Sequence, residues 1–164
     1  MKRIAKFHKV SLEQFKKDWI DTFGLDEEAN IEEIYENIKL PRRATAGSAG
    51  YDFFAPVRLI LEPGETLKIP TGIRVEMDPE WVLKCYPRSG LGFKYRLQLN
   101  NTVGIIDSDY FYLTMRDIFL QRSSNDSNEG KSVSIQAGTG FMQGIFVEYG
   151  ITVDDDAKGV SDER

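Results

Sequence analysis

The sequence is poor in the residue types that build metal sites and disulfides. Its 164 residues include a single cysteine, Cys85, and a single histidine, His8. One cysteine excludes an internal disulfide and an all-cysteine metal site, and one histidine excludes a zinc site built on a histidine pair. Because proteins without disulfides are typical of reducing compartments, we expect this one to act in the cytoplasm.

Long apolar runs are also missing. No stretch approaches the about 18 consecutive apolar residues that a membrane-spanning helix needs. The N-terminal sequence MKRIAKFHKVSLEQF lacks the apolar core of a secretory signal. We therefore expect no membrane association. The hydrophobic share of 41% and the charged share of 29% are those of an ordinary globular chain, and the length suits one domain.

The chain carries no large excess of positive charge. It has 21 basic and 26 acidic side chains, which gives a net charge of −5. Residues 41–153 hold 12 basic and 12 acidic side chains, so the net negative charge comes from the two ends of the chain. A chain without net positive charge does not favour a polyanionic partner, and we expect no nucleic acid to be bound.

Proline and glycine are nearly absent from residues 1–40, where Gly24 is the one example. Ser11 followed by Gln14 is a capping-box pattern that predicts the start of a helix. Apolar residues then recur at spacings of three and four, as on one face of a helix: Leu12, Phe15, Trp19, Ile20 and Phe23.

A second helix is predicted over 31–38, before Pro41. We therefore expect a helical N-terminal extension over 1–40. It either packs on the main domain or offers a surface to a partner protein, and the sequence leaves both possibilities open.

From residue 41 to 153 the pattern changes to short apolar runs separated by turn residues. The runs 57–62 and 66–77 flank a Pro-Gly-Glu turn and predict a hairpin. Many short strands at this spacing predict a mainly β domain, built as a sandwich, barrel or jelly roll. Residues 154–164 have little apolar content and are predicted to form a flexible tail.

Two polar stretches of this domain are unusual for strands. Asp52 lies between aromatic residues, where a carboxylate is costly unless it is paired or faces water. Arg88, Ser89 and Gly90 combine a guanidinium, a hydroxyl and a glycine, which suits the binding of an anion. A plain turn that leads into a helix explains this second stretch equally well.

Two further stretches carry candidate residues. Asp107 and Asp109 follow an apolar run, and a carboxylate there is either a base that activates water or the polar end of a strand. Gln143 lies inside an apolar strand. A buried amide needs hydrogen-bond partners, so Gln143 either faces a ligand or is satisfied within the core.

Together these stretches form a recognisable set of motifs. AGYDFFA (49–55), PRSGLGFK (87–94) and VGIIDSDY (103–110) occur in the order and spacing of the first three motifs of one family. GTGFMQGIF (138–146) partly matches its fourth motif, Gly-x-Arg-x-Ala-Gln. The chain from Leu40 to Val153 resembles the trimeric all-β dUTPase family. The resemblance implies a distorted jelly-roll or β-barrel domain, which follows the helical extension predicted over 1–40.

The resemblance also implies an activity. Family members hydrolyse dUTP to dUMP and pyrophosphate with Mg²⁺, in a homotrimer whose sites lie between subunits. By this resemblance Asp107 would orient and deprotonate the attacking water, and Asp52 would hold waters of a Mg²⁺ bound to the triphosphate. A set of residues would bind the substrate: Arg88, Ser89, Gly90, Asn101, Gly104, Ile106, Tyr110 and Gln143.

Within that set the roles differ. The hairpin that carries Asn101, Gly104 and Ile106 would read uracil through backbone groups, and Tyr110 would stack on the deoxyribose. The second-motif residues, from Arg88 to Gly90, would bind the phosphates with help from Gln143.

The chain departs from the family pattern at three places. Gly140 stands where the fourth motif usually has Arg, so one phosphate-side cation is either absent or supplied elsewhere, for example by Lys94. The Arg-Gly-Glu usual after Tyr110 is missing. Residues 154–164 do not contain the family's glycine-rich fifth motif. Because that motif positions the triphosphate, we expect nucleotide binding to survive better than turnover.

Two other functions remain open on the same fold. One is a dCTP deaminase, although the Asp107–Tyr110 pattern favours a dUTPase. The other is a nucleotide-binding regulatory module with little catalysis, which would act through protein partners bound to residues 1–40.

Overall fold

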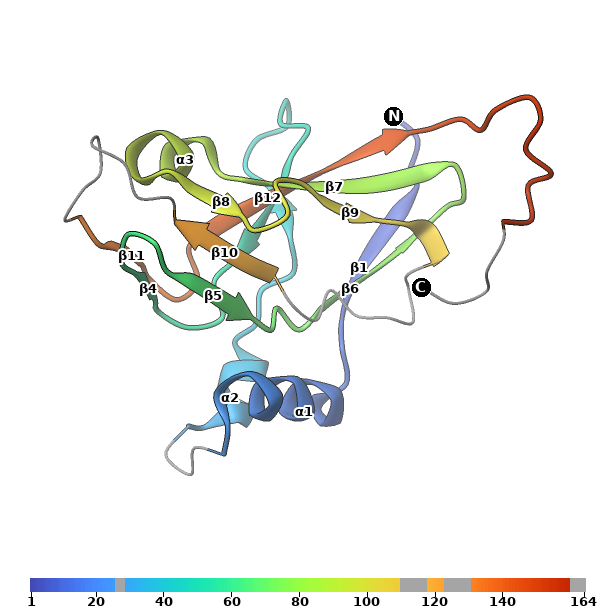
Figure 1. Cartoon of the computed structure of the whole chain (residues 1–164). Helices are drawn as coiled ribbons and strands as arrows, with labels where there is room; N and C mark the ends of the chain where they lie inside the picture. The colour runs from blue at the N-terminus through green and yellow to red at the C-terminus, as the bar shows by residue number, and fades with distance from the viewer. Residues whose placement is uncertain (26–28, 110–117, 123–130, 160–164) are drawn as a thin grey trace.

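The fold is described from a computed structural model, which places residues 1–25, 29–109, 118–122 and 131–159 (Figure 1). Three helices are described: α1 (Leu12–Phe23), α2 (Ile31–Glu36) and α3 (Ser89–Tyr95). The strands are β1 (Ala5–Lys9), β2 (Arg42–Arg43), β3 (Tyr51–Phe54), β4 (Leu59–Leu61), β5 (Thr66–Ile69), β6 (Ile73–Met77), β7 (Trp81–Pro87), β8 (Leu97–Leu99), β9 (Gly104–Ile106), β10 (Ile118–Arg122), β11 (Val133–Ile135) and β12 (Gly140–Glu148).

The largest sheet has five strands in the order β2-β3-β12-β7-β9, and each neighbouring pair is antiparallel. Smaller sheets are formed by β1-β6, by β5-β10-β8 and by β4-β11. Apart from β2 and β3, the paired strands are not consecutive in the sequence, as in a jelly roll. The predicted mainly β fold is confirmed.

Side chains on the inner faces of these strands pack together to form the hydrophobic core. Leu83 and Cys85 of β7 are fully buried, and they point to the same side as Phe53 of β3. Gly144 of β12 lies between them: a Cβ there would stand 2.8 Å from Leu83 Cδ1 and 3.0 Å from Phe53 Cε2. Burial raises the pKa of the Cys85 thiol to about 12, because the interior disfavours the thiolate.

The predicted hairpin around the Pro-Gly-Glu turn is wrong. The turn does form, with the Glu65 amide donating to the Glu62 carbonyl. In the described part of the chain, however, β4 pairs with β11 and β5 pairs with β10. The turn residues fix a reversal of the chain, but they do not decide which strand completes each ladder.

The two predicted helices are present near the N-terminus. Ser11 Oγ accepts a hydrogen bond from the Gln14 amide at 3.1 Å, as the capping pattern requires. The Gln14 side chain turns away from the cap and donates to Asp18 Oδ1 at 2.8 Å. The helix ends at Gly24, whose φ of 77° is one that glycine adopts readily.

The N-terminal segment also contains a strand that the sequence did not predict. β1 pairs with β6 in antiparallel register, and the Phe7 ring packs 5.4 Å from the Tyr51 ring and 5.7 Å from the Phe53 ring. Phe15 of α1 is fully buried in the common core. The segment therefore packs on the β domain, while a partner for it and the domain limits 1–40, 41–153 and 154–164 remain predictions.

A membrane-spanning helix is not found. None of the helices within the described ranges has both the length and the apolar character needed to cross a bilayer.

Candidate functional site

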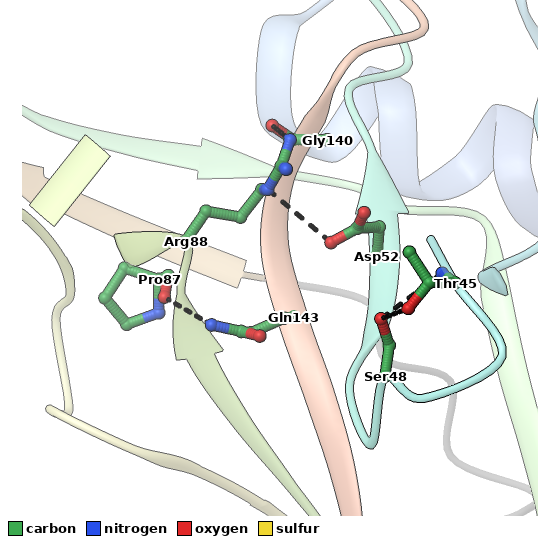
Figure 2. Close-up of polar contacts among 7 residues, drawn as sticks. All are labelled: Thr45, Ser48, Asp52, Pro87, Arg88, Gly140 and Gln143. Atoms are coloured by element: carbon green, nitrogen blue, oxygen red, sulfur yellow. Dashed lines mark hydrogen bonds and ion pairs between the residues drawn. The ribbon is translucent and has the colours of Figure 1, made fainter. Parts of the chain in front are cut away.

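Three of the four motifs meet at one end of the large sheet. In the ladder, Gln143 of β12 lies opposite Asp52 of β3 on one side and opposite Tyr86 of β7 on the other. Because paired residues point to the same face, this register brings the first, second and fourth motifs together. Figure 2 shows Asp52, Arg88 and Gln143 around the start of β12.

Arg88 links β7 to the other two strands. Arg88 occupies the N-cap position of α3, and its backbone there is extended. Its Nε lies 3.5 Å from Asp52 Oδ1 (Figure 2). Its Nη1 donates to the Gly140 carbonyl at 3.5 Å. The Asp52 side chain is 18% exposed and the Arg88 side chain 46% exposed. Asp52 is therefore a paired carboxylate within the sheet, and the guanidinium that pairs with it remains accessible to an anion.

Gln143 is held by backbone groups. Its Nε2 donates to the Pro87 carbonyl at 3.4 Å. Its Oε1 lies against Gly50, where a Cβ would stand only 2.8 Å away. Gly50 thus makes the space that the amide occupies, which explains a glycine two residues before Asp52 on physical grounds.

The second motif continues into α3, as the alternative reading of a turn leading into a helix predicts. Ser89 and Gly90 form the first turn of this helix and are exposed. The first N–H groups of a helix have no acceptor within it, so these two residues can still donate to an anion. Lys94 lies in the last turn of α3, at the far end from Ser89.

The third motif is not brought to this cluster within one chain. β9 pairs with β7 at the sheet edge, with Gly104 opposite Cys85 and Ile106 opposite Leu83. The register ends at Ile106, and Asp107 is the next residue along the chain. Extending the register by one residue would set the Asp107 backbone six positions along β7 from Arg88, roughly 20 Å at about 3.3 Å per residue. Figure 1 shows β9 leading away from α3 toward the opposite end of the sheet.

The remaining third-motif residues lie around β9. Asn101 is exposed in the turn before the strand, and Gly104 is buried against Cys85, whose Cβ would be 3.1 Å from a Cβ on the glycine. Ile106 is half-buried. Tyr110 lies outside the described residues, so its predicted place remains untested.

A metal would find few protein ligands here. Within the described ranges, no three His, Cys, Asp or Glu residues are grouped so as to hold an ion. The cluster offers one carboxylate, Asp52, which suits an ion that keeps its waters and takes its other ligands from phosphate oxygens.

A known protein family matches most of the chain. The sequence model of the dUTPase family matches residues 36–156. The chain belongs to the dUTPase family. It is 51% identical over 80 residues to the deoxyuridine 5'-triphosphate nucleotidohydrolase of Psychromonas ingrahamii, a match that covers 47% of this chain and 53% of that protein. The chain spans about half the length of the curated relatives it matches.

Solved dUTPases share the fold. The dUTPase from Streptococcus mutans has a TM-score of 0.61 and 30% identity, with 89% of this chain and 97% of that chain covered. A mutant dUTPase from phage phi11 of S. aureus, described with a structural Mg(II) ion, has a TM-score of 0.64 at 18% identity. That match covers 96% of this chain and 99% of the phage protein.

Sequence reasoning missed the spatial role of two glycines in the site. Gly50 makes room for the Gln143 amide, and Gly140 makes room for Arg88, whose Nη1 would be 2.9 Å from a Cβ on that glycine. The signal was present, because both glycines lie inside the motifs, but only the pairing of β3 and β12 shows which side chain each one accommodates.

Proposed function

We propose that this dUTPase-family protein hydrolyses dUTP to dUMP and pyrophosphate. The observation that carries the proposal is the cluster of Asp52, Arg88 and Gln143, which the first, second and fourth family motifs build at one end of the sheet. An exposed guanidinium, a helix start and an amide suit a polyphosphate chain. The reducing cytoplasm, expected for a chain with one buried cysteine, is the proposed place of action.

The proposed site lies between copies of the chain. By the strand spacing, the backbones of Asp107 and Arg88 lie roughly 20 Å apart along the sheet, which is more than the two side chains span together. A second copy must then supply the carboxylate that acts on a nucleotide bound at Arg88. We propose the family's homotrimer as the assembly that does so.

The proposed reaction assigns each residue a task. Asp107 accepts a proton from water while the water oxygen bonds to the α-phosphorus, and the bond from that phosphorus to the bridging oxygen breaks. The bridging oxygen leaves with pyrophosphate. Arg88, Ser89 and Gly90 hold the phosphate chain, and Gln143 donates its amide to it once the weak 3.4 Å bond to Pro87 opens.

Uracil and deoxyribose are assigned to the third motif. The backbone groups of Asn101, Gly104 and Ile106 would recognise the base, and Tyr110 would stack on the sugar. Asp52 would hold the waters of a Mg²⁺ bound to the triphosphate, and the ion would supply positive charge to the leaving pyrophosphate.

The test is pyrophosphate release from dUTP with Mg²⁺, compared between the wild type, Asp107→Asn and the control Asp78→Asn. Asp78 is an exposed carboxylate in the turn between β6 and β7. We expect Asp107→Asn to lower kcat on the order of 10²–10⁴-fold while the control is unchanged. Turnover that is unaffected by Asp107→Asn would remove the assigned base.

The same assay separates the alternatives. Ammonia release from dCTP would indicate a deaminase. Binding of dUTP without pyrophosphate release would favour a regulatory module. The absence of both dUTP binding and dUTP turnover would overturn the proposal.

A further inference from the structure

The fourth motif lacks its usual cation at Gly140, and the structure shows what lies in that direction. Gly140 is the ladder partner of Phe54, so a side chain at 140 would point to the same face as the Phe54 ring. A Cβ at 140 would stand 2.9 Å from Arg88 Nη1 and 3.2 Å from Arg88 Cδ. The family's arginine would therefore project into the space between Arg88 and Phe54.

Two cations from outside the motifs lie against the Phe54 ring. The Arg42 guanidinium carbon is 5.7 Å from the centroid of the Phe54 ring, and Lys39 Nζ is 5.8 Å from the same centroid. Lys39 also donates to the Gly138 carbonyl at 3.3 Å, within the fourth motif. Both side chains belong to exposed residues.

The register fixes Arg42 on the face of the site. Arg42 of β2 is the ladder partner of Asp52 of β3, so their side chains point to the same side of the sheet. Arg88 pairs with Asp52, and Lys39 and Arg42 contact the Phe54 ring, so three positive charges lie along β3 against the single carboxylate of Asp52. Lys94, the cation that the sequence offered as a substitute, lies at the far end of α3.

We propose that Lys39 and Arg42 supply the phosphate-side cation missing at Gly140 and bind the terminal phosphates of the triphosphate. This inference rests on the proposed function for the identity of the nucleotide, but the cation site itself can be tested with inorganic tripolyphosphate. Both cations belong to exposed residues, and their weak stacking on the half-buried Phe54 ring leaves them able to turn toward an anion. The charge that the family places on β12 is then provided by the segment that leads from α2 into β2.

The test measures dissociation constants of the intact chain for dUMP, for the non-hydrolysable α,β-imido analogue of dUTP and for tripolyphosphate, each with Mg²⁺. The variant is Lys39→Gln with Arg42→Gln. The matched control is Lys17→Gln with Arg58→Gln, two exposed cations placed on α1 and before β4. A charge-conserving variant, Lys39→Arg with Arg42→Lys, tests whether charge alone suffices.

We expect the double Gln variant to bind the triphosphate analogue and tripolyphosphate at least tenfold more weakly, on the order of one lost charge-assisted contact. Binding of dUMP should stay within about twofold, and raising the salt concentration should reduce the difference between wild type and variant. The control and the charge-conserving variant should retain most of the triphosphate affinity.

The outcomes distinguish this inference from the proposed function. Equal losses for dUMP and the triphosphate would mean that the two cations only support the pocket, and would overturn the inference. Unchanged triphosphate binding in an active variant would overturn it and leave the function intact. If the wild type binds tripolyphosphate but no uracil nucleotide, and the double Gln variant loses tripolyphosphate binding, the result would support the cation site and overturn the proposed function. A wild-type chain that binds neither tripolyphosphate nor the two uracil nucleotides would overturn both the inference and the proposed function.

Discussion

Gly140 and Arg88 fit against each other. The Arg88 side chain lies across the bare backbone of Gly140, with Nη1 donating to the carbonyl of that residue and standing 2.9 Å from where its Cβ would be. The same guanidinium pairs with Asp52 through Nε. A glycine in the fourth motif thus determines the position of the second-motif arginine.

Gly140→Ala should therefore impair the site with little loss of stability. The added methyl group meets the end of a flexible side chain first, so Arg88 can turn away from Asp52 and from the phosphate position. We expect KM for dUTP to rise by up to about tenfold, the worth of one charge-assisted contact. Steady-state kinetics would measure this rise, with Gly150→Ala as the control, because nothing lies within 4 Å of a Cβ there. An unchanged KM would contradict the role given to Gly140.

Gly72 lies between β5 and β6, where side chains of the N-terminal segment pack against its backbone. We expect Gly72→Ala to destabilise the fold. Its φ is 68°, and a Cβ would stand 2.6 Å from Ile38 Cδ1 and 3.2 Å from Phe15 Cδ2. We expect a loss of about 2–5 kcal/mol, since left-handed backbone costs about 1–2 kcal/mol and overpacking about 1–3 kcal/mol.

Gly64→Ala is the matched control for that experiment. Gly64 also has a positive φ, 85°, but nothing lies within 4 Å of its Cβ position. Urea denaturation of both variants isolates the packing contribution as the difference between them. Equal decreases in the free energy of unfolding would show that Phe15 and Ile38 do not pack closely against Gly72.

Cys85 should make stability fall at alkaline pH. Burial raises the pKa of its thiol to about 12 in the folded chain, against about 8.5 for an unperturbed cysteine. The stabilisation by the neutral buried thiol is therefore complete below about pH 8.5 and is lost as the pH rises toward 12, because only the unfolded chain releases the proton. The slope contributed by this thiol approaches about 1.4 kcal/mol per pH unit.

Comparison with Cys85→Ala removes the other titrating groups from this measurement. The free energy of unfolding of both proteins would be followed by denaturation between pH 7 and about pH 11, a span that brackets the ordinary thiol pKa. The difference between them should shrink as the pH rises. A constant difference would mean that the thiol titrates normally in the folded chain.

Local patterns predicted the parts of this fold that depend on near neighbours in the chain. The periodic apolar residues and the Ser11 cap located α1, because a helix satisfies its backbone within itself. The hairpin over 57–77 failed because strands are completed by partners far away in the sequence, here β10 and β11. β1 was missed for the same reason, since its partner β6 comes more than 60 residues later.

The candidate site shows the same division. The motifs located Asp52, Arg88 and Gln143, and the structure brings these three together. The sequence could not show that β9 leads Asp107 away from Arg88 along the sheet, because that depends on the register of β9 against β7. It could not show the two cations on Phe54 either, since Lys39 and Arg42 lie outside every motif.

The proposed active site cannot be completed by one copy of the chain. The most direct test is pyrophosphate release from dUTP by co-expressed Asp107→Asn and Arg88→Gln chains. Each variant alone should be nearly inactive, because every site then lacks either the base or the phosphate-binding guanidinium. In randomly mixed assemblies, about one quarter of the sites pair an intact Arg88 with an intact Asp107 from a neighbour, so about one quarter of wild-type activity should return. A mixture no more active than the two variants measured separately would contradict a site shared between copies of the chain.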